Sequence, residues 1–531
     1  MSKLIDKYPV PLLIIIGLGL YAFNLGELQV SIMEARNFVV AREMITENNW
    51  LLTTMNTLPR YEKPPFPAWF TTPFAYIFGV NNVWAYRIPT SIFSILGIVY
   101  FFKLINTWLS KDIAFYAALI LATSFYYIVI RFEAPSDIYT HVSMIIALYF
   151  LMRHPQISFN NVFLGGLFLG FSILSKGPVS LYALFSPFFL AYIFTFKVQI
   201  KSFLLWVLTF LIIGLLVGGS WYIYVRYADP NTIVEIASEE AGNWTSYHVK
   251  PFYYYWNFFI QSGIWTIPAF LSLFYPYFKN RIKQKQLYKF SFLWTILAVV
   301  LLSVIPEKKP RYLVPVLFPL AIITSLVINY FIHNKQDRFS KLFHYVHYSV
   351  IMIACIVVVI APFILDLQLT WKFMLLVLLS IFSLYVCYFT FKALKYKNFK
   401  SLFWSNIVFI LLITSLGQAR IEYLKKNKDY KALGINGIGK KKIPTYYYKN
   451  LPPEVIWEYG KTVPKFSSDR IPELPFRLLI SENNLKTFIS KHPGLLNLSK
   501  KEVFDRNYFR KGEKRHTRFI THVYEIVNKK R

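Results

Sequence analysis

The chain has 531 residues, of which 55% are hydrophobic and only 16% charged, and its mean hydropathy is +0.41. Because so few charges cannot cover globular cores of this size, the composition excludes a soluble enzyme and places most of the chain in lipid. The 58 Lys and Arg outnumber the 27 Asp and Glu, for a net charge of +31, which predicts anionic partners such as lipid headgroups or phosphates.

Apolar windows long enough to cross a bilayer recur up to about residue 418 and predict about thirteen transmembrane helices. The first window, residues 9–23, lacks a small-residue cleavage site behind it, so we expect a retained span rather than a signal peptide. We therefore predict a polytopic α-helical membrane domain over residues 1–419. Residues 420–531 hold 26 Lys and Arg against 11 Asp and Glu, which predicts a separate basic domain.

Loop charges predict the orientation. With the N-terminus inside, the even-numbered connections carry the Lys and Arg excess that is typical of cytoplasmic loops, and an odd number of spans places the C-terminal domain outside. This division of the charge between inner loops and an outer domain argues against nucleic acid as a partner. Cys355 and Cys387 both lie inside apolar runs, so no disulfide framework is expected.

Ten cations in the outer loops work against this orientation bias and need another reason to be there. A phosphate at the outer face supplies one, because Arg and Lys both bind phosphate oxygens. The alternative is that each reaches an outer-leaflet headgroup on its own. The ten are Arg36, Arg42, Lys63, Arg87, Arg131, Lys176, Lys250, Lys308, Lys309 and Arg311.

Two outer loops, residues 27–84 and 227–254, are far longer than connections need, and such loops are usually functional. Within the first, residues 33–48 predict an amphipathic helix on the membrane surface. After it, prolines at 64 and 65 should hold Glu62 and Lys63 in an extended conformation. A carboxylate of the first loop and His248 in the second could share a divalent metal ion, Zn²⁺, Mg²⁺ or Mn²⁺, although a lone loop histidine is more often a hydrogen-bonding residue.

Several motifs, in order along residues 27–320, resemble the bacterial aminoarabinose transferase and protein O-mannosyltransferase superfamily of integral-membrane GT-C glycosyltransferases. They are Glu34-Ala35-Arg36, Tyr61-Glu62-Lys63-Pro64-Pro65, Ser175-Lys176-Gly177-Pro178, Trp221-Tyr222, His248 with Pro251-Phe252-Tyr253-Tyr254, and Lys309-Pro310-Arg311-Tyr312. The resemblance implies a GT-C fold with a small soluble C-terminal α/β domain. It also implies a bacterial inner-membrane protein whose active site and C-terminal domain face the periplasm.

The same resemblance implies a function and a set of site residues. The donor would be a polyprenyl-phosphate (undecaprenyl-phosphate) sugar, and the acceptor lipid A or a related envelope molecule; we expect a monomer surrounded by membrane lipids. The donor phosphate would be bound by a set of basic and tyrosine side chains, with Glu62 and His248 as the metal pair. The set comprises Arg36, Tyr61, Lys63, Lys250, Arg311 and Tyr312.

Two acids are candidates for catalysis. Displacing a polyprenyl phosphate passes through an oxocarbenium-like state, and a hydroxyl acceptor would need a carboxylate base, Glu34 or Asp137. Each could instead serve the start of a helix. The chain departs from the family at Met33, where an acidic pair usually begins, and this mildly favours a phosphate acceptor, which needs no base.

Two other functions remain open. A relative of the O-mannosyltransferases would glycosylate secreted proteins. A lipid-linked sugar flippase or transporter would place its charges near the middle of the membrane, whereas the polar residues of this chain gather in outer loops.

Overall fold

The structure is a computed structural model, and it describes residues 2–527 with several gaps. The gaps are residues 134, 154–157, 197–199, 365–370, 397, 418–426, 432, 435–442, 468–470, 493–498 and 508–515. The domain boundary predicted at residues 419 and 420 lies outside the described residues.

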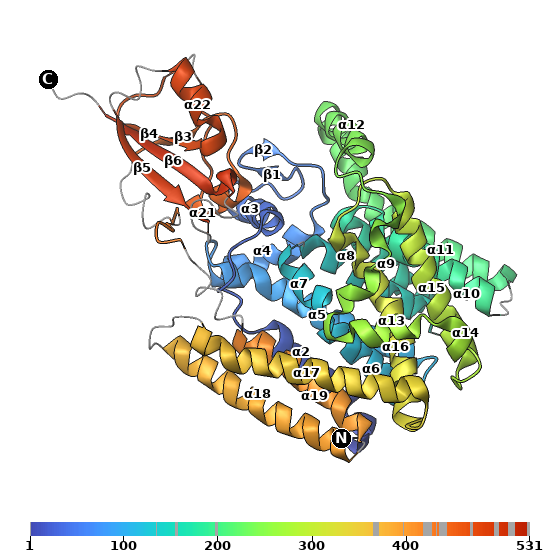
Figure 1. The fold of residues 1–531 in the computed structure, drawn as a ribbon. Helices are drawn as coiled ribbons and strands as arrows, with labels where there is room; N and C mark the ends of the chain where they lie inside the picture. The colour runs from blue at the N-terminus through green and yellow to red at the C-terminus, as the bar shows by residue number, and fades with distance from the viewer. Residues whose placement is uncertain are drawn as a thin grey trace.

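Helices build the body of the molecule (Figure 1). The α-helices before the first long gap are α1 (Ser2–Lys7), α2 (Pro9–Tyr21), α3 (Ile32–Thr46), α4 (Phe66–Phe78), α5 (Val83–Asn106), α6 (Lys111–Thr123), α7 (Phe125–Glu133), α8 (Pro135–Leu151), α9 (Phe159–Lys176), α10 (Ser186–Thr195), α11 (Ile200–Ala228), α12 (Pro230–Ser246), α13 (Thr266–Ser272), α14 (Tyr275–Phe278), α15 (Lys285–Val304), α16 (Val314–His333) and α17 (Arg338–Ile364). They are followed by α18 (Trp371–Lys395) and α19 (Phe399–Leu412), and shorter turns are η1 (Leu181–Phe185), η2 (Phe252–Tyr255), η3 (Phe258–Trp265), η4 (Pro310–Leu313) and η5 (Ile413–Gly417).

A helix lies at the centre of each predicted span, but the spans differ in length. Seven helices are long and apolar enough to cross a membrane, or eight if α6 and α7, bent by 49° at a short break, form one span. These counts cover the described residues, and several of the about thirteen predicted spans are shorter or interrupted. Near residue 266, for example, Gly263 adopts a positive φ of 65° within η3, three residues before α13 begins, so that span is divided.

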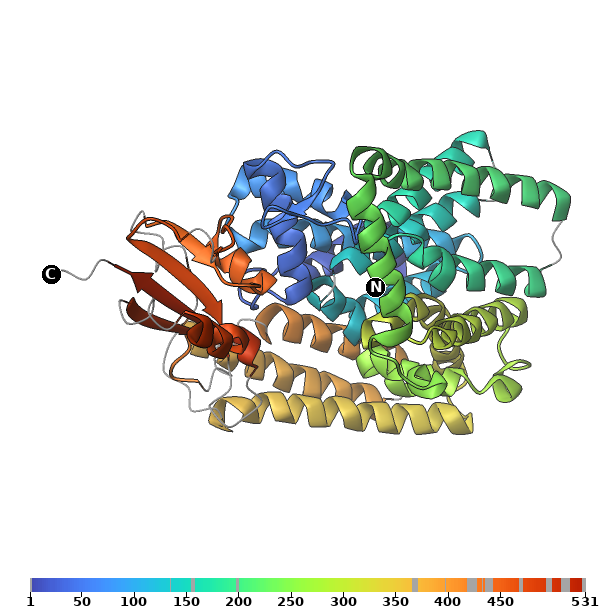
Figure 2. The ribbon, with the colours of Figure 1, turned by 90° about the horizontal axis from the view of Figure 1, so that it is seen from above.

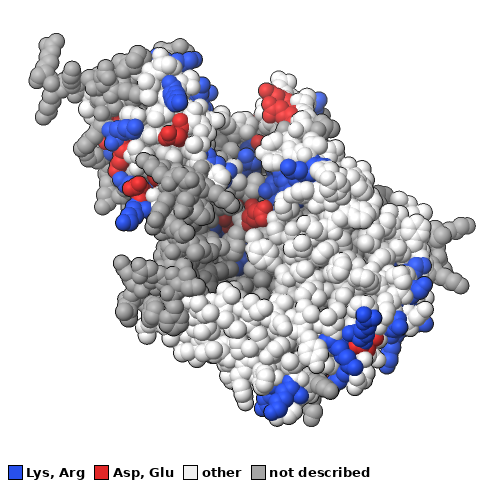
Figure 3. Space-filling view, in the orientation of Figure 1, with Lys and Arg blue, Asp and Glu red and all other residues white. Residues whose placement is uncertain are grey.

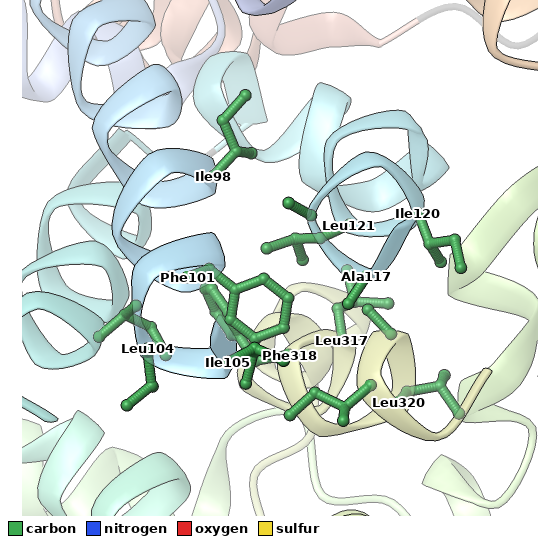
Figure 4. Close-up of a cluster of buried hydrophobic side chains, with 14 of the residues drawn as sticks. Ile98, Phe101, Leu104, Ile105, Ala117, Ile120, Leu121, Leu317, Phe318 and Leu320 are labelled. Carbon is green, nitrogen blue, oxygen red and sulfur yellow. The ribbon is translucent and has the colours of Figure 1, made fainter. Parts of the chain in front are cut away.

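The core of the body is apolar. Figure 4 shows side chains of α5, α6 and α16 meeting in one cluster, among them Phe101, Leu121 and Phe318. The rings of Phe101 and Phe318 lie 5.6 Å apart in an edge-to-face arrangement. This packing fixes the helices whose ends carry the outer loops.

Helices α9 and α11 approach closely because glycines face each other between them. Gly166 and Gly170 on α9, and Gly214 and Gly218 on α11, each recur at a four-residue spacing. A Cβ atom on Gly218 would lie 2.5 Å from the Cβ of Ile173, and one on Gly170 would lie 2.4 Å from Val217. Small residues at this spacing let membrane helices pack backbone to backbone. The contact positions Lys176, the last residue of α9.

The two ends of the body carry the charge. Figure 3 shows a row of Lys and Arg along the end near the N-terminus, a broad uncharged belt, and further basic side chains at the end that holds the C-terminal domain. Figure 2 likewise shows this domain at one end of the helices. The N-terminus and the C-terminal domain thus lie at opposite ends, as an odd number of spans requires.

The first long loop is folded and buried rather than spread on the membrane surface. The predicted amphipathic helix exists as α3, but its charged residues are buried together with its apolar ones. Arg42 donates to the carbonyls of Ile456 and Trp457, at 3.0 and 3.1 Å, so the C-terminal domain covers this helix. A hairpin of β1 (Thr54–Met55) and β2 (Leu58–Pro59) follows α3.

The second long loop also contains a helix. Residues 230–246 form α12, which projects from the body beside the C-terminal domain (Figure 1). The described residues of α12 are mostly exposed. The loop predicted at 227–254 therefore consists mainly of α12, which begins two residues after the end of α11.

The C-terminal domain is a small α/β domain, as predicted. Its four strands are β3 (Thr445–Tyr447), β4 (Phe476–Ser481), β5 (Ser499–Asp505) and β6 (Ile520–Ile526), in the order β3-β4-β6-β5. β3 and β4 are parallel, and the other pairs are antiparallel. Helices α21 (Pro453–Tyr459) and α22 (Glu482–Lys491) and the turn η7 (Thr517–Phe519) complete it. The ring of Trp457 packs against Phe38 and Tyr86, which joins the domain to the body.

The glycine contact between α9 and α11 generates a stability prediction. We expect Gly218→Ala to destabilise the protein by about 1–3 kcal/mol, because the new methyl group overlaps Ile173. Gly219→Ala is the matched control, since a Cβ at Gly219 meets nothing within 4 Å and alanine favours the helix. Thermal unfolding of the detergent-solubilised variants measures the difference. Equal midpoints for the two variants would contradict the packing described.

Candidate active site

A pocket opens at the outer end of the body, between α3, the first loop and the start of α8. The space inside it, open solvent included, is about 360 Å³. Met33 and Asn37 line it from α3, Arg60 and Lys63 from the loop, and Ser136 from α8. Figure 3 shows basic side chains around a hollow in this region, between the C-terminal domain and the body.

The loop that carries Lys63 is fixed at both ends. Thr53 and Arg60 close it, because the Thr53 hydroxyl donates to the Arg60 carbonyl at 2.7 Å and the Arg60 amide donates back to Thr53 at 2.8 Å. Pro65 caps α4, so Arg60 to Pro65 stay outside any helix, as predicted. The chain bends at Glu62 and Lys63 instead of running straight as expected.

Lys63 is surrounded by positive charge. Burial, together with Lys176, Arg60 and Arg311, lowers the pKa of its ammonium group to about 7, against a smaller opposing effect of Asp137. No carboxylate forms an ion pair with Lys63 among the described residues. An anion that entered the pocket would therefore relieve repulsion that the free protein sustains.

Two guanidinium groups near this pocket are also incompletely paired. The Nε atoms of Arg36 and Arg311 are both buried, and within the described part of the chain neither has a hydrogen-bond partner. Arg311 lies within electrostatic range of Lys63, and Arg36 lies within electrostatic range of Arg60. Buried polar atoms of this kind call for a partner, and phosphate oxygens match guanidinium geometry.

Asp137 sits at the centre of the cluster rather than at its edge. Its carboxylate pairs with the Lys176 ammonium, and His141 lies 4.0 Å away. Lys176 in turn lies over the ring of Tyr312, 5.0 Å from the centroid. The Tyr312 hydroxyl donates to Glu307 at 3.3 Å. Asp137 and Tyr312, both predicted site residues, are thus brought beside Lys63.

Glu34 has a different environment. Both of its oxygens accept hydrogen bonds from Arg87, at 2.7 and 3.0 Å, and it completes the cap of α3 with Ser31. The carboxylate is fully buried and doubly bound. This geometry argues against Glu34 as a proton acceptor and favours the helix-start alternative, with a buried ion pair added.

Other predicted cations have internal partners. Arg42 and Arg87 already have the hydrogen-bond partners described above, and Arg131 donates to the Tyr21 carbonyl. Lys308 donates to the carbonyls of Ile305 and of Lys250, at 2.6 and 3.1 Å, and Lys309 pairs with Glu307. Phosphate binding therefore stays a prediction only for those of the ten cations that lack such partners.

Two further predicted phosphate ligands lie away from the pocket. The Tyr61 hydroxyl donates to Asp229 at 3.1 Å, and this bond together with burial raises the pKa of Tyr61 to about 12. Lys250 is exposed, and its segment pairs through the backbone with Pro306. Lys250 is at most a rim residue in this conformation.

The predicted metal pair does not form a preformed site. Glu62 lies 3.9 Å from Arg60, and the ring of the exposed His248 makes an edge-to-face contact with Tyr247. Across the described residues, three or more His, Cys, Asp or Glu side chains nowhere gather as a metal would require. A metal held by these two residues stays a prediction, and no chemistry is derived from it here.

Sequence reasoning left out Lys176 and Arg60 as site residues, although both lie next to predicted ones. Lys176 belongs to the Ser-Lys-Gly-Pro motif and ends α9 before Gly177, whose φ is 73°. Lys176 and Asp137 lie 39 residues apart in the chain, so their pairing could not be predicted from the sequence.

The fold and this pocket define a class: a multi-pass membrane protein with a pocket lined by basic side chains at the end of its helices that carries a small α/β domain. Among solved structures, ArnT from Cupriavidus metallidurans has the same fold. Superposition on its complex with undecaprenyl phosphate gives a TM-score of 0.68 and 16% identity, covering 98% of each chain, and the apo state gives 0.66 and 17%.

Sequence comparisons agree. Residues 62–222 match the family described as dolichyl-phosphate-mannose-protein mannosyltransferase. The undecaprenyl phosphate-alpha-4-amino-4-deoxy-L-arabinose arabinosyl transferase of Shewanella sediminis is 25% identical over 380 residues, 66% of each chain. That of Wigglesworthia glossinidia brevipalpis is 24% identical over 305 residues, 55% of this chain and 53% of the relative.

The chain thus spans between about half and two thirds of the length of these curated relatives. The predicted GT-C fold is confirmed, because the chain shares the fold of the ArnT structure over 98% of its length.

The lowered pKa of Lys63 predicts pH-dependent phosphate binding. An anion binds the protonated ammonium, so we expect the affinity for undecaprenyl phosphate to fall about tenfold or more between about pH 7 and about pH 8.5. The second ionisation of a phosphate, near pH 6, is nearly complete in this range. In Lys63→Arg the guanidinium stays charged, and the fall should be much smaller. Identical pH profiles for the two proteins would show that another group titrates.

The metal hypothesis has a direct test. Since Glu62 already pairs with Arg60, we expect undecaprenyl phosphate binding to be unchanged in excess EDTA. A loss of binding in EDTA that Zn²⁺ restores in the wild type, but not in Glu62→Ala or His248→Ala, would show that these residues hold a metal. Isothermal titration with and without the chelator measures both outcomes.

Proposed function

We propose that this protein is a membrane glycosyltransferase that moves a sugar from a polyprenyl-phosphate donor, such as undecaprenyl phosphate, to lipid A or a related envelope acceptor. The site would face the periplasm of the bacterial inner membrane. The observation that carries the proposal is the unpaired positive charge of Lys63, Arg36 and Arg311 beside a pocket at the outer end. The names of the relatives and the undecaprenyl phosphate bound by the ArnT of C. metallidurans support it.

The cations suit the leaving group of such a reaction. As the bond between the sugar and the phosphate breaks, negative charge grows on the phosphate oxygens. Lys63, Arg311 and Arg36 are already in place to stabilise that charge, and electrostatic preorganisation of this kind is usually the largest contribution to catalysis. These cations repel one another in the free pocket. The fully ionised leaving phosphate therefore compensates their charge better than the phosphate of the intact donor does.

Asp137 is the carboxylate best placed to act on an acceptor hydroxyl. It is buried beside Lys63 and held by Lys176, which keeps it ionised and oriented. Transfer to a phosphate acceptor would need no base, and Asp137 would then only position Lys176. The present geometry supports either acceptor, with Asp137 in place of Glu34 as the catalytic candidate.

The matched family description favours one alternative, transfer to secreted proteins as in protein O-mannosyltransferases. The donor side of the reaction would be the same, and the acceptor would differ. The size and shape of the pocket that holds the donor sugar would decide whether a pentose or a hexose is transferred.

The proposal predicts a loss of transfer in Lys63→Ala. Removing one preorganised cation from the developing charge should lower the rate about 10²-fold or more, while the thermal midpoint stays close to that of the wild type. The matched control is Lys486→Ala, an exposed lysine on α22 outside the pocket. Inner-membrane vesicles supplied with a radiolabelled undecaprenyl-phosphate sugar, followed by extraction of lipid A and of protein, measure the product and identify the acceptor.

Full transfer by Lys63→Ala would remove the phosphate site from the mechanism. Movement of the intact donor across the vesicle membrane without any labelled acceptor would instead indicate a flippase.

A further inference from the structure

The pocket beside Lys63 is positively charged and its described lining contains no carboxylate. Arg60 and Lys63 are its charged members, and Met33 and Val40 are apolar. Such a lining is suited to a ligand with anionic and neutral groups, and it offers nothing to a cation.

The carboxylates nearest to the lining in sequence are engaged elsewhere. Glu34, beside Met33, gives both oxygens to Arg87. Asp137, beside Ser136, pairs with Lys176. Glu62, beside Lys63, lies 3.9 Å from Arg60, so each acid already has a positive partner.

Neutral hydrogen-bonding groups remain available in the same lining. The side-chain amide of Asn37 and the hydroxyl of Ser136 have no hydrogen-bond partner within the described residues, and Asn37 is 9% exposed. The Thr53 hydroxyl uses its hydrogen for the Arg60 carbonyl and keeps its lone pairs. Amide and hydroxyl groups that can both donate and accept are the natural partners of sugar hydroxyls.

We propose that this pocket binds the sugar of the donor, that Asn37 and Ser136 bind its hydroxyl groups, and that the sugar is uncharged rather than an amino sugar. This inference rests on the proposed function, because it assumes that a phosphate-linked sugar enters. A ring amino group is an ammonium at neutral pH and would approach Lys63 and Arg60, while the nearby carboxylates of Asp137 and Glu62 lie outside the lining and already have positive partners. The substrate would then differ from the 4-amino-4-deoxy-L-arabinose in the names of the relatives.

Met33 is the position that separates the two specificities. Its side chain lines the pocket one residue before Glu34, so an acid there would place a carboxylate in the lining, unlike Glu34, whose oxygens face Arg87. Met33→Asp should therefore create a partner for an ammonium group. Met33→Asn is the matched control, because the asparagine side chain is polar and has the shape of aspartate but carries no charge.

The test compares two donors that differ in one group: undecaprenyl phosphate-arabinose and undecaprenyl phosphate-4-amino-4-deoxy-arabinose. Each competes with radiolabelled undecaprenyl phosphate for the purified full-length protein. We expect the wild type and Met33→Asn to bind the neutral donor at least about tenfold more tightly than the amino donor. In Met33→Asp this ratio should fall about tenfold or more.

The outcomes separate the inference from the function beneath it. If the wild type binds undecaprenyl phosphate but prefers the amino donor, or binds both donors equally, the inference is overturned and the proposed function stands. If the wild type binds neither donor nor undecaprenyl phosphate, both fail. Should Met33→Asp lose undecaprenyl phosphate binding through misfolding, the wild-type ratio alone decides. Asn37→Ala should weaken both sugar donors relative to undecaprenyl phosphate, and an unchanged ratio would contradict its role.

Discussion

Repulsion between half-buried cations is the constraint on which the site depends. Lys176, Arg60 and Arg311 all lie within electrostatic range of Lys63, in a region where water screens charge poorly, and Asp137 offsets part of the repulsion. A protein that only needed to fold would gain by neutralising such a cluster. The tertiary structure instead holds it together, by the closure of the loop between Thr53 and Arg60 and by the end of α9. An anionic ligand is the natural counterpart of this arrangement.

The carboxylates decide which cations are available. Arg87 is neutralised by Glu34, and Arg42 is used to join α3 to the C-terminal domain, so both are structural despite their place in the outer loops. Lys309 has Glu307. The cations without such partners lie around one pocket, so the uneven distribution of acids, rather than the number of bases, leaves this pocket positively charged.

Several features were predictable because they depend on short stretches of chain. The helix at residues 32–46 follows from its capping residues and apolar spacing, and the irregular stretch before α4 follows from its two prolines. Lys63 lies just before these prolines and could likewise be chosen as a candidate site residue from the sequence. The burial of α3 could not, since the domain that covers it begins about 400 residues later, and the pairing of Glu34 with Arg87 joins residues 53 apart.

The sequence by itself determined that the protein spans a membrane and carries an excess of positive charge, and it predicts that the two ends of the chain lie on opposite sides. These properties are sums over composition and periodicity, to which each residue contributes independently of its partners. The tertiary structure alone decided which of those charges are paired, which acid stands beside Lys63, and that Met33 lines a pocket without a carboxylate. Such outcomes depend on contacts of a few ångströms between segments that are distant in the chain, and local sequence carries no record of them.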